Sequence, residues 1–205
     1  VVLASTIFSI CQWVAWNKKN LVDERYLLTE RLLELFGRDQ LENEPVAVRI
    51  VFDKINRSAN VVRKARDRTI YKDTWLVMSG KFADGSKFSL KIEQIMHVKF
   101  RKGKEKHKGY VVSLTTAFSR KQYGALNLSS AKANAAMQLS SNARLKSLKV
   151  KGNVLQICAA LPFPVGLPFK TQEACDELSQ LITMMLLSSY EVLRSQSHTA
   201  ASSAS

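Results

Sequence analysis

Cysteine and histidine are scarce in this chain of 205 residues, and the few present are scattered. The three cysteines, Cys11, Cys158 and Cys175, form no CxxC pair and are too few for a disulfide framework. The three histidines lie in separate segments, and no two of them are spaced to share one face of a helix. The sequence therefore predicts no metal site, and we expect the cysteines to act as small hydrophobic residues.

Motifs that mark the common enzyme classes are also missing. The chain has no Walker loop, no GxGxxG and no GxSxG, and its serine-rich stretches have no lysine or histidine arranged to activate a hydroxyl. Acidic residues are sparse where a catalytic pair would be needed, with six between positions 46 and 170. We therefore expect a protein that is not an enzyme and that binds no cofactor.

Positive charge exceeds negative charge, and the excess is concentrated in the middle of the chain. Residues 1–45 have a net charge of −2, residues 171–205 have −3, and residues 46–170 hold 25 bases against six acids, or +19. A field of that sign attracts phosphate-rich or acidic surfaces. The candidate partners are an anionic membrane, an acidic protein face and nucleic acid.

The first sixteen residues are uncharged and strongly apolar. As a helix they would span roughly 24 Å, somewhat less than the roughly 30 Å of a bilayer core. Trp13 and Trp16, followed by Lys18 and Lys19, match an interfacial aromatic belt with a cytoplasmic positive flank. We predict a transmembrane or membrane-anchor helix over residues 1–19, with the following domain on the cytoplasmic side. A buried helix of a soluble protein and a targeting remnant are the alternatives.

The pattern then changes from helical to alternating. Residues 20–36 predict an amphipathic helix, and we interpret residues 20–45 as a stalk helix with its linker. Strands are predicted over residues 46–52, 74–82, 87–101 and 109–118, while residues 60–68 fit a strand or an exposed loop. Asp84-Gly85 and Gly152-Asn153 are hairpin turn signals.

A short helix near residues 130–139 and a long amphipathic helix over residues 171–194 complete the pattern. We therefore predict an α+β fold over residues 46–194, in which an antiparallel β-sheet is followed by a C-terminal amphipathic helix. The order of strands and helix is also compatible with a barrel that resembles a pleckstrin-homology domain, which is an analogy of fold alone. Residues 195–205 are predicted to be a flexible tail.

The densest positive charge lies at the turn between two predicted strands. We predict that it binds an anion or a partner, and its bases are Lys99, Arg101, Lys102, Lys104, Lys106 and Lys108. A second basic stretch, which would join the same patch if it forms a loop, contains Arg63, Lys64, Arg66 and Arg68. An ordinary solvated turn that protects a sheet edge is the competing interpretation.

These observations predict a membrane-anchored accessory or scaffold subunit. Its basic sheet domain would dock on an anionic membrane surface or on an acidic protein partner within a membrane complex. The alternative is a soluble nucleic-acid-binding module associated with RNA, which would show steeply salt-dependent binding.

Overall fold

A computed structural model describes residues 23–40, 44–100, 103–124, 126, 130–162 and 172–202. The predicted membrane segment, with Trp13, Trp16, Lys18 and Lys19, lies outside these residues. None of the described helices combines the length and the apolar character that crossing a bilayer requires.

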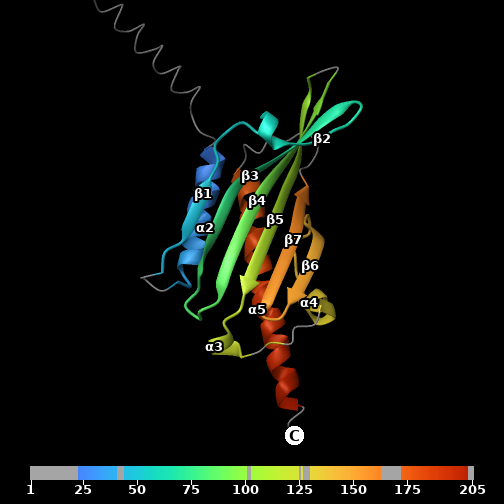
Figure 1. The fold of residues 1–205 in the computed structure, drawn as a ribbon. Coiled ribbons are helices and arrows are strands. Elements are labelled where there is room, and N and C mark those ends of the chain that lie inside the picture. Colours follow the sequence, from blue (N-terminus) through green and yellow to red (C-terminus); the bar gives the residue numbers. More distant parts are fainter. Residues whose placement is uncertain are drawn as a thin grey trace, which may run out of the picture.

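In the part of the chain that the structure describes, seven antiparallel strands form one sheet (Figure 1). They are β1 (Ala47–Ile50), β2 (Val61–Lys64), β3 (Arg68–Lys81), β4 (Lys87–Lys99), β5 (Glu105–Ala117), β6 (Arg144–Lys151) and β7 (Val154–Pro162). The order is β1-β3-β4-β5-β7-β6, and β2 pairs with β3 next to the start of that strand. Within the described chain the two edge strands, β1 and β6, do not pair with each other, so the sheet is open. The predicted antiparallel sheet is confirmed, and the described strands do not close into the barrel that was its alternative.

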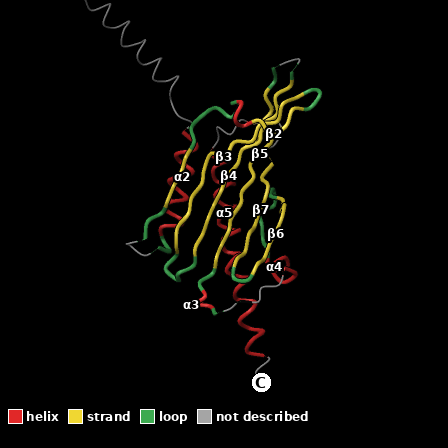
Figure 2. The backbone as a smooth tube through the Cα atoms, in the orientation of Figure 1, coloured by secondary structure: helices red, strands yellow, loops and turns green. Residues whose placement is uncertain are grey.

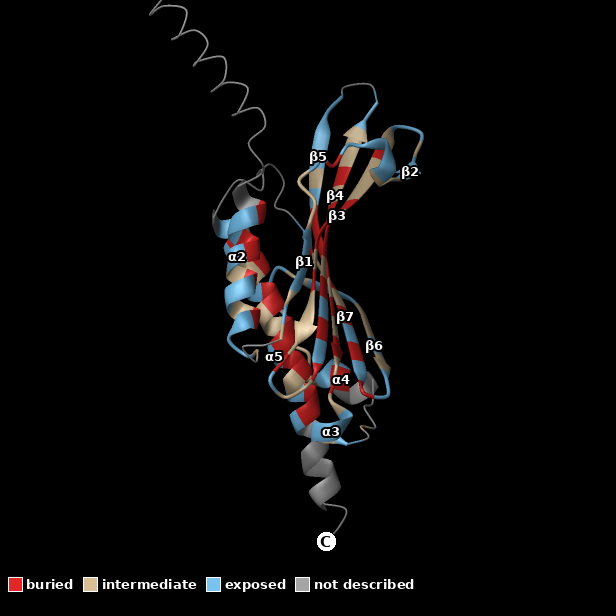
Figure 3. Cartoon of the chain, turned by 60° about the vertical axis from the view of Figure 1, so that its left-hand side comes forward, coloured by how far each residue is buried: buried red, intermediate tan, exposed pale blue. Residues whose placement is uncertain are grey.

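The helices are α2 (Asp23–Gly37), α3 (Arg120–Tyr123), α4 (Ser130–Ala136) and α5 (Gln172–Ser202), with a short 3₁₀ helix, η1, at Ser58–Asn60. Both α2 and α5 lie on one face of the sheet, as Figure 3 shows. None of the described helices covers the opposite face in that view, and we call it the open face. The C-terminal helix is confirmed, and it continues beyond the predicted end at Arg194.

Alternation along the strands separates the two faces. In β4, Phe88, Leu90 and Ile92 are buried against the helices, whereas Lys87 and Ser89 are exposed on the open face. Facing them, α2 contributes three fully buried side chains and α5 a longer apolar row; these are Leu28, Leu32, Phe36, Leu178, Leu181, Ile182 and Met185. The predicted stalk is therefore an integral part of the core, because its apolar stripe is covered by the sheet and by α5.

Hairpins are placed where the sequence predicts them. Asp84-Gly85 joins β3 to β4, and Gly152-Asn153 joins β6 to β7. Gly109 occupies a position that requires glycine, although no turn motif marks it in the sequence. A bulge next to it shifts the register between β4 and β5. The φ of Gly109 is +124°, and a Cβ there would lie 2.1 Å from the carbonyl oxygen of Leu161 on β7. Only glycine allows β5 and β7 to approach this closely.

Candidate anion-binding site

Two hairpin turns meet at one end of the sheet, shown at the top of Figure 2. The backbone N–H of Phe100, after β4, donates to the carbonyl oxygen of Asp67, before β3, at 3.1 Å. Arg68 and Lys99 are register partners. We call this end, which contains residues 65–68, 99–100 and 103–108, the tip. Residues 60–68, whose sequence fits a strand or a loop, form the end of η1, the strand β2 and the turn that leads into β3. This turn brings the basic side chains at the end of the stretch to the tip.

A pocket of about 280 Å³ opens on the open face beside the tip. Six residues from β3, β4, β5 and the turn line it, and we call them the basic pocket: Arg68, His97, Lys99, Lys104, Lys106 and Lys108. Strand register explains the convergence, because Arg68 faces Lys99 across one strand pair and His97 faces Lys106 across the next. None of these six residues is acidic.

Electrostatics in the basic pocket are unbalanced. Burial lowers the pKa of His97, and the nearby charges of Lys108, Arg68 and Lys106 lower it further, while Asp67 opposes them. The imidazole is therefore held neutral, and its buried Nδ1 makes no hydrogen bond in the described structure. Asp67 is already engaged, since the hydrogen bond from Arg68 Nε at 2.9 Å lowers the pKa of that carboxyl group.

The sequence-predicted bases divide into three groups. Lys99, Lys104, Lys106, Lys108 and Arg68 come together in the basic pocket. Three others are exposed on β2 or in the β2–β3 turn but do not line the pocket, namely Arg63, Lys64 and Arg66. Arg101 and Lys102 lie outside the described residues.

His97 was not predicted as a site residue, since a single histidine in a strand is usually structural. The signal that could have identified it is alternation, because positions 97 and 99 of one strand project to the same face. The same rule extends positive charge along the open face. Strand register places these further bases there: Arg49, Lys72, Lys87, Lys91, Arg144, Lys149 and Lys151. Among the described strand residues of that face, Glu93 is the one acid.

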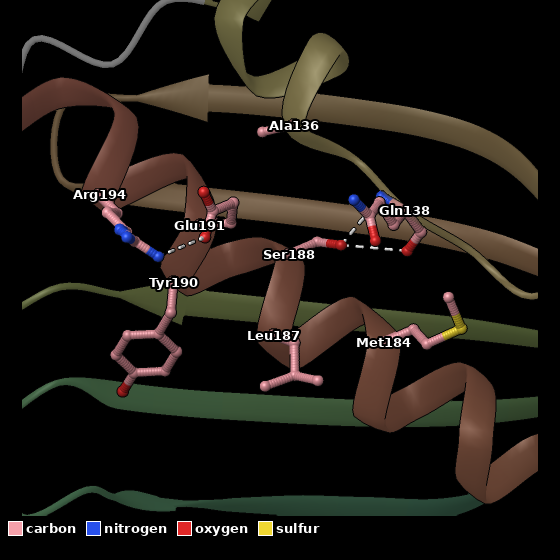
Figure 4. A pocket seen from close by; sticks show the side chains of 8 residues that line it. All are labelled: Ala136, Gln138, Met184, Leu187, Ser188, Tyr190, Glu191 and Arg194. Atoms are coloured by element: carbon pink, nitrogen blue, oxygen red, sulfur yellow. Dashed lines mark hydrogen bonds and ion pairs between the residues drawn. The ribbon is translucent and has the colours of Figure 1, made fainter.

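A second cavity of about 430 Å³ lies between α5 and the segment after α4 (Figure 4). Ser188 Oγ accepts from the backbone N–H of Gln138 and donates to its carbonyl oxygen, each at 3.0 Å. The remaining lining is mainly apolar, and its two charged side chains, Glu191 and Arg194, form a pair at 4.0 Å. This cavity is larger, but its charges are balanced, so it has no preference for an anion.

The helix α2, with which the described part of the chain begins, runs along the sheet from the tip side to the opposite end. Near the beginning of α2, Arg25 reaches Asp73 and Gln94, which lie in the tip-ward parts of β3 and β4. Near its end, Phe36 stacks on Phe88 at the opposite end of β4, with ring centroids 4.4 Å apart. The helix therefore begins on the tip side of the sheet, as Figure 1 also shows.

Comparison of the chain with protein-family models, curated proteins and solved structures gives no match. Within the described residues, no group of three or more His, Cys, Asp and Glu side chains is placed to bind a metal ion.

Proposed function

We propose that this protein is a membrane-anchored accessory or scaffold subunit that docks its tip on an anionic bilayer surface. The observation that carries the proposal is that the basic pocket and the start of α2 lie towards the same end of the sheet. Residues 17–22 can span at most about 25 Å, so the apolar segment 1–16 ends within that distance of α2. A bilayer that holds this segment would be within reach of the tip.

The chemistry of the tip suits a headgroup surface. Its lysines end in mobile ammonium groups, and each base near an anionic membrane contributes about 1 kcal/mol. Phe100 is 55% exposed in the same turn, so an apolar side chain accompanies the charges. Exposed Trp, Phe and Leu side chains can insert into the boundary between headgroups and acyl chains. Lys18 and Lys19 would place the domain on the cytoplasmic side.

Lysine footprinting of the full chain in proteoliposomes tests the docking. We expect a water-soluble acylating reagent to modify Lys104, Lys106 and Lys108 several-fold more slowly in vesicles with 30% phosphatidylglycerol than in pure phosphatidylcholine. Sodium chloride at 0.5 M should restore the rate, because salt screens exposed charges.

The control is built into the same molecule. Lys87, Lys149 and Lys151 are exposed on the open face at the end away from the tip, so their acylation rates should not change. Equal rates at the tip in the two lipids would refute docking. Release of the full chain by carbonate would refute the anchor.

Nucleic acid is the competing polyanion. Filter binding of the full chain to single-stranded RNA across a salt series would show a steep slope if several phosphates are contacted. Steep, tight RNA binding together with unprotected tip lysines would replace the membrane proposal.

A further inference from the structure

We infer that the basic pocket is a binding site for a terminal phosphate monoester group. The inference deepens the proposed function, on which it rests where the phosphate belongs to a lipid headgroup. The same chemistry is offered by a soluble phosphorylated compound, so the ligand class is defined by the phosphate group rather than by what carries it.

The size of the basic pocket limits the ligand. Pockets for drug-sized molecules begin at about 300 Å³, so a volume of about 280 Å³ holds a phosphate group with a small polar carrier. Three adjacent strands of the paired sheet form most of the walls, and Lys104 comes from the turn. Strand pairing fixes the backbone positions of the other cationic side chains. A small, highly charged group therefore fits better than an extended chain.

The charge of the basic pocket selects a monoester over a diester. Five bases surround the space, and Asp67, the acid nearest to Arg68, is exposed beside the pocket rather than among its lining residues. A phosphate monoester carries a charge of about −1.5 to −2 at neutral pH and has three free oxygens. A diester has one charge and two free oxygens, so it neutralises less of the cluster and accepts fewer charge-assisted hydrogen bonds.

His97 adds a feature that a simple lysine patch lacks. Its ring is less exposed than the lysines around it, and its Nδ1 is buried without a hydrogen bond in the described structure. The neighbouring cations oppose a charged imidazole, and a bound dianion would offset that opposition. A bound phosphate thus relieves repulsion among the lysines and makes the charged form of the neutral His97 imidazole less unfavourable.

The experiment uses the detergent-solubilised full chain and two small probes, methyl phosphate and dimethyl phosphate. The NMR resonances of the His97 ring protons report binding to the pocket. The dissociation constant should be at least about tenfold lower for methyl phosphate than for dimethyl phosphate. Lys106→Gln should weaken methyl phosphate binding several-fold. Lys149→Gln removes the same charge from the open face away from the tip and should leave binding unchanged. Both lysines are exposed, so neither variant should lose its fold.

Proteoliposomes distinguish the two sources of phosphate. Vesicles with phosphatidic acid, a monoester, are compared with phosphatidylglycerol vesicles, a diester, at matched zeta potential, by acylation of Lys106. Stronger protection by phosphatidic acid supports a lipid source. Equal protection together with tight methyl phosphate binding supports the site and assigns it to a soluble compound.

The inference and the proposed function fail separately. The phosphate site is overturned if methyl phosphate binds no more tightly than dimethyl phosphate, or if Lys149→Gln weakens methyl phosphate binding as much as Lys106→Gln does. Either result overturns the site even if the tip lysines are protected on phosphatidylglycerol. Tight methyl phosphate binding with no protection on either lipid supports the site and removes membrane docking.

Discussion

Glu93 shows how one residue can organise a basic surface. Its side chain is nearly buried on the open face, where Lys72 Nζ lies 2.8 Å and Lys91 Nζ 2.9 Å from its carboxylate oxygens. Burial acts to raise the pKa of Glu93, but the hydrogen bonds from Lys72 and Lys91 and the positive charges of the two lysines together outweigh it, so the pKa is lowered. The carboxylate therefore stabilises the fold in its ionised form and holds two lysines in place.

Glu93→Gln should lower the free energy of unfolding by about 1–2 kcal/mol at pH 7, since charge-assisted hydrogen bonds are lost while the half-exposed lysines remain solvated. The pH dependence follows from the lowered pKa. The contribution of Glu93 is complete above the ordinary value of 4.5 and is lost as the pH falls through the folded-state value. Urea unfolding at pH 7 and at pH 4 or below measures the difference between the two proteins.

The exposed Glu191 provides a control of the same chemistry. Glu191→Gln should change the free energy of unfolding by less than about 0.5 kcal/mol at both values of pH. The difference in the free energy of unfolding between Glu93→Gln and the unsubstituted protein should shrink at low pH. If this difference stays constant down to pH 3, ionisation of Glu93 does not stabilise the fold.

At the scale of elements, the sequence was informative wherever local chemistry decides the structure. Asp84-Gly85 fixes a hairpin, and the alternation of Phe88, Leu90 and Ile92 fixes which face of β4 is buried. The apolar stripes in the sequences of α2 and α5 predict that both segments are helices. These features depend on neighbours in sequence, which is why the pattern predicts them.

Features that depend on distant pairing were missed. The start of β3 at Arg68 could not be recognised, because the basic, β-branched pattern of residues 60–68 suits a loop equally well, and only pairing with β2 and β4 extends the strand. The pocket role of His97 depends on the register of β4 with β5. An open sheet and a barrel differ only in whether the edge strands meet, which alternation along one strand does not specify.

The attachment of α2 to the sheet is a further contact that sequence alone conceals. Arg25 is buried, and its guanidinium donates to Asp73 Oδ2 at 3.0 Å, to Gln94 Oε1 at 3.3 Å and to the carbonyl oxygen of Val51. It also lies over the ring of Trp75, 5.3 Å from the centroid. Burial raises the pKa of Asp73 although Arg25 opposes this, so the carboxylate depends on the guanidinium to stay ionised.

Arg25→Leu should destabilise the fold by about 3–5 kcal/mol, because it leaves a buried carboxyl group without its partner. A double-mutant cycle with Asp73→Leu, followed by urea unfolding, measures the coupling. The double variant should be more stable than Arg25→Leu alone, since no unpaired buried charge remains. Additive losses would show that Arg25 acts through its packing on Trp75 and not through the ion pair.

At the scale of the whole molecule, the partition of charge along the chain becomes a partition between faces. Glu30, Glu34 and Asp176 are exposed on the helices α2 and α5. In contrast, strand register places Lys87, Lys91 and Lys149 on the open face. Such a molecule is oriented by the field of an anionic surface before it makes contact. The uneven distribution of charge, rather than the net charge of +14 itself, would orient the molecule at an anionic surface. Two orientations would place basic residues against a bilayer: tip towards the bilayer, or open face towards it.

Photocrosslinking to lipid separates these orientations. The photoreactive residue p-benzoylphenylalanine replaces, one at a time, Phe100 at the tip, Val154 on the open face away from the tip, and Leu187 on α5. All three native side chains are exposed, by 55%, 37% and 63% respectively, so the replacements should preserve the fold. Because the start of α2 lies on the tip side, we expect lipid adducts at position 100 in phosphatidylglycerol proteoliposomes and background levels at the other two. Adducts at position 154 would instead show that the open face lies on the bilayer, and equal labelling of all three would show that the domain has no fixed orientation.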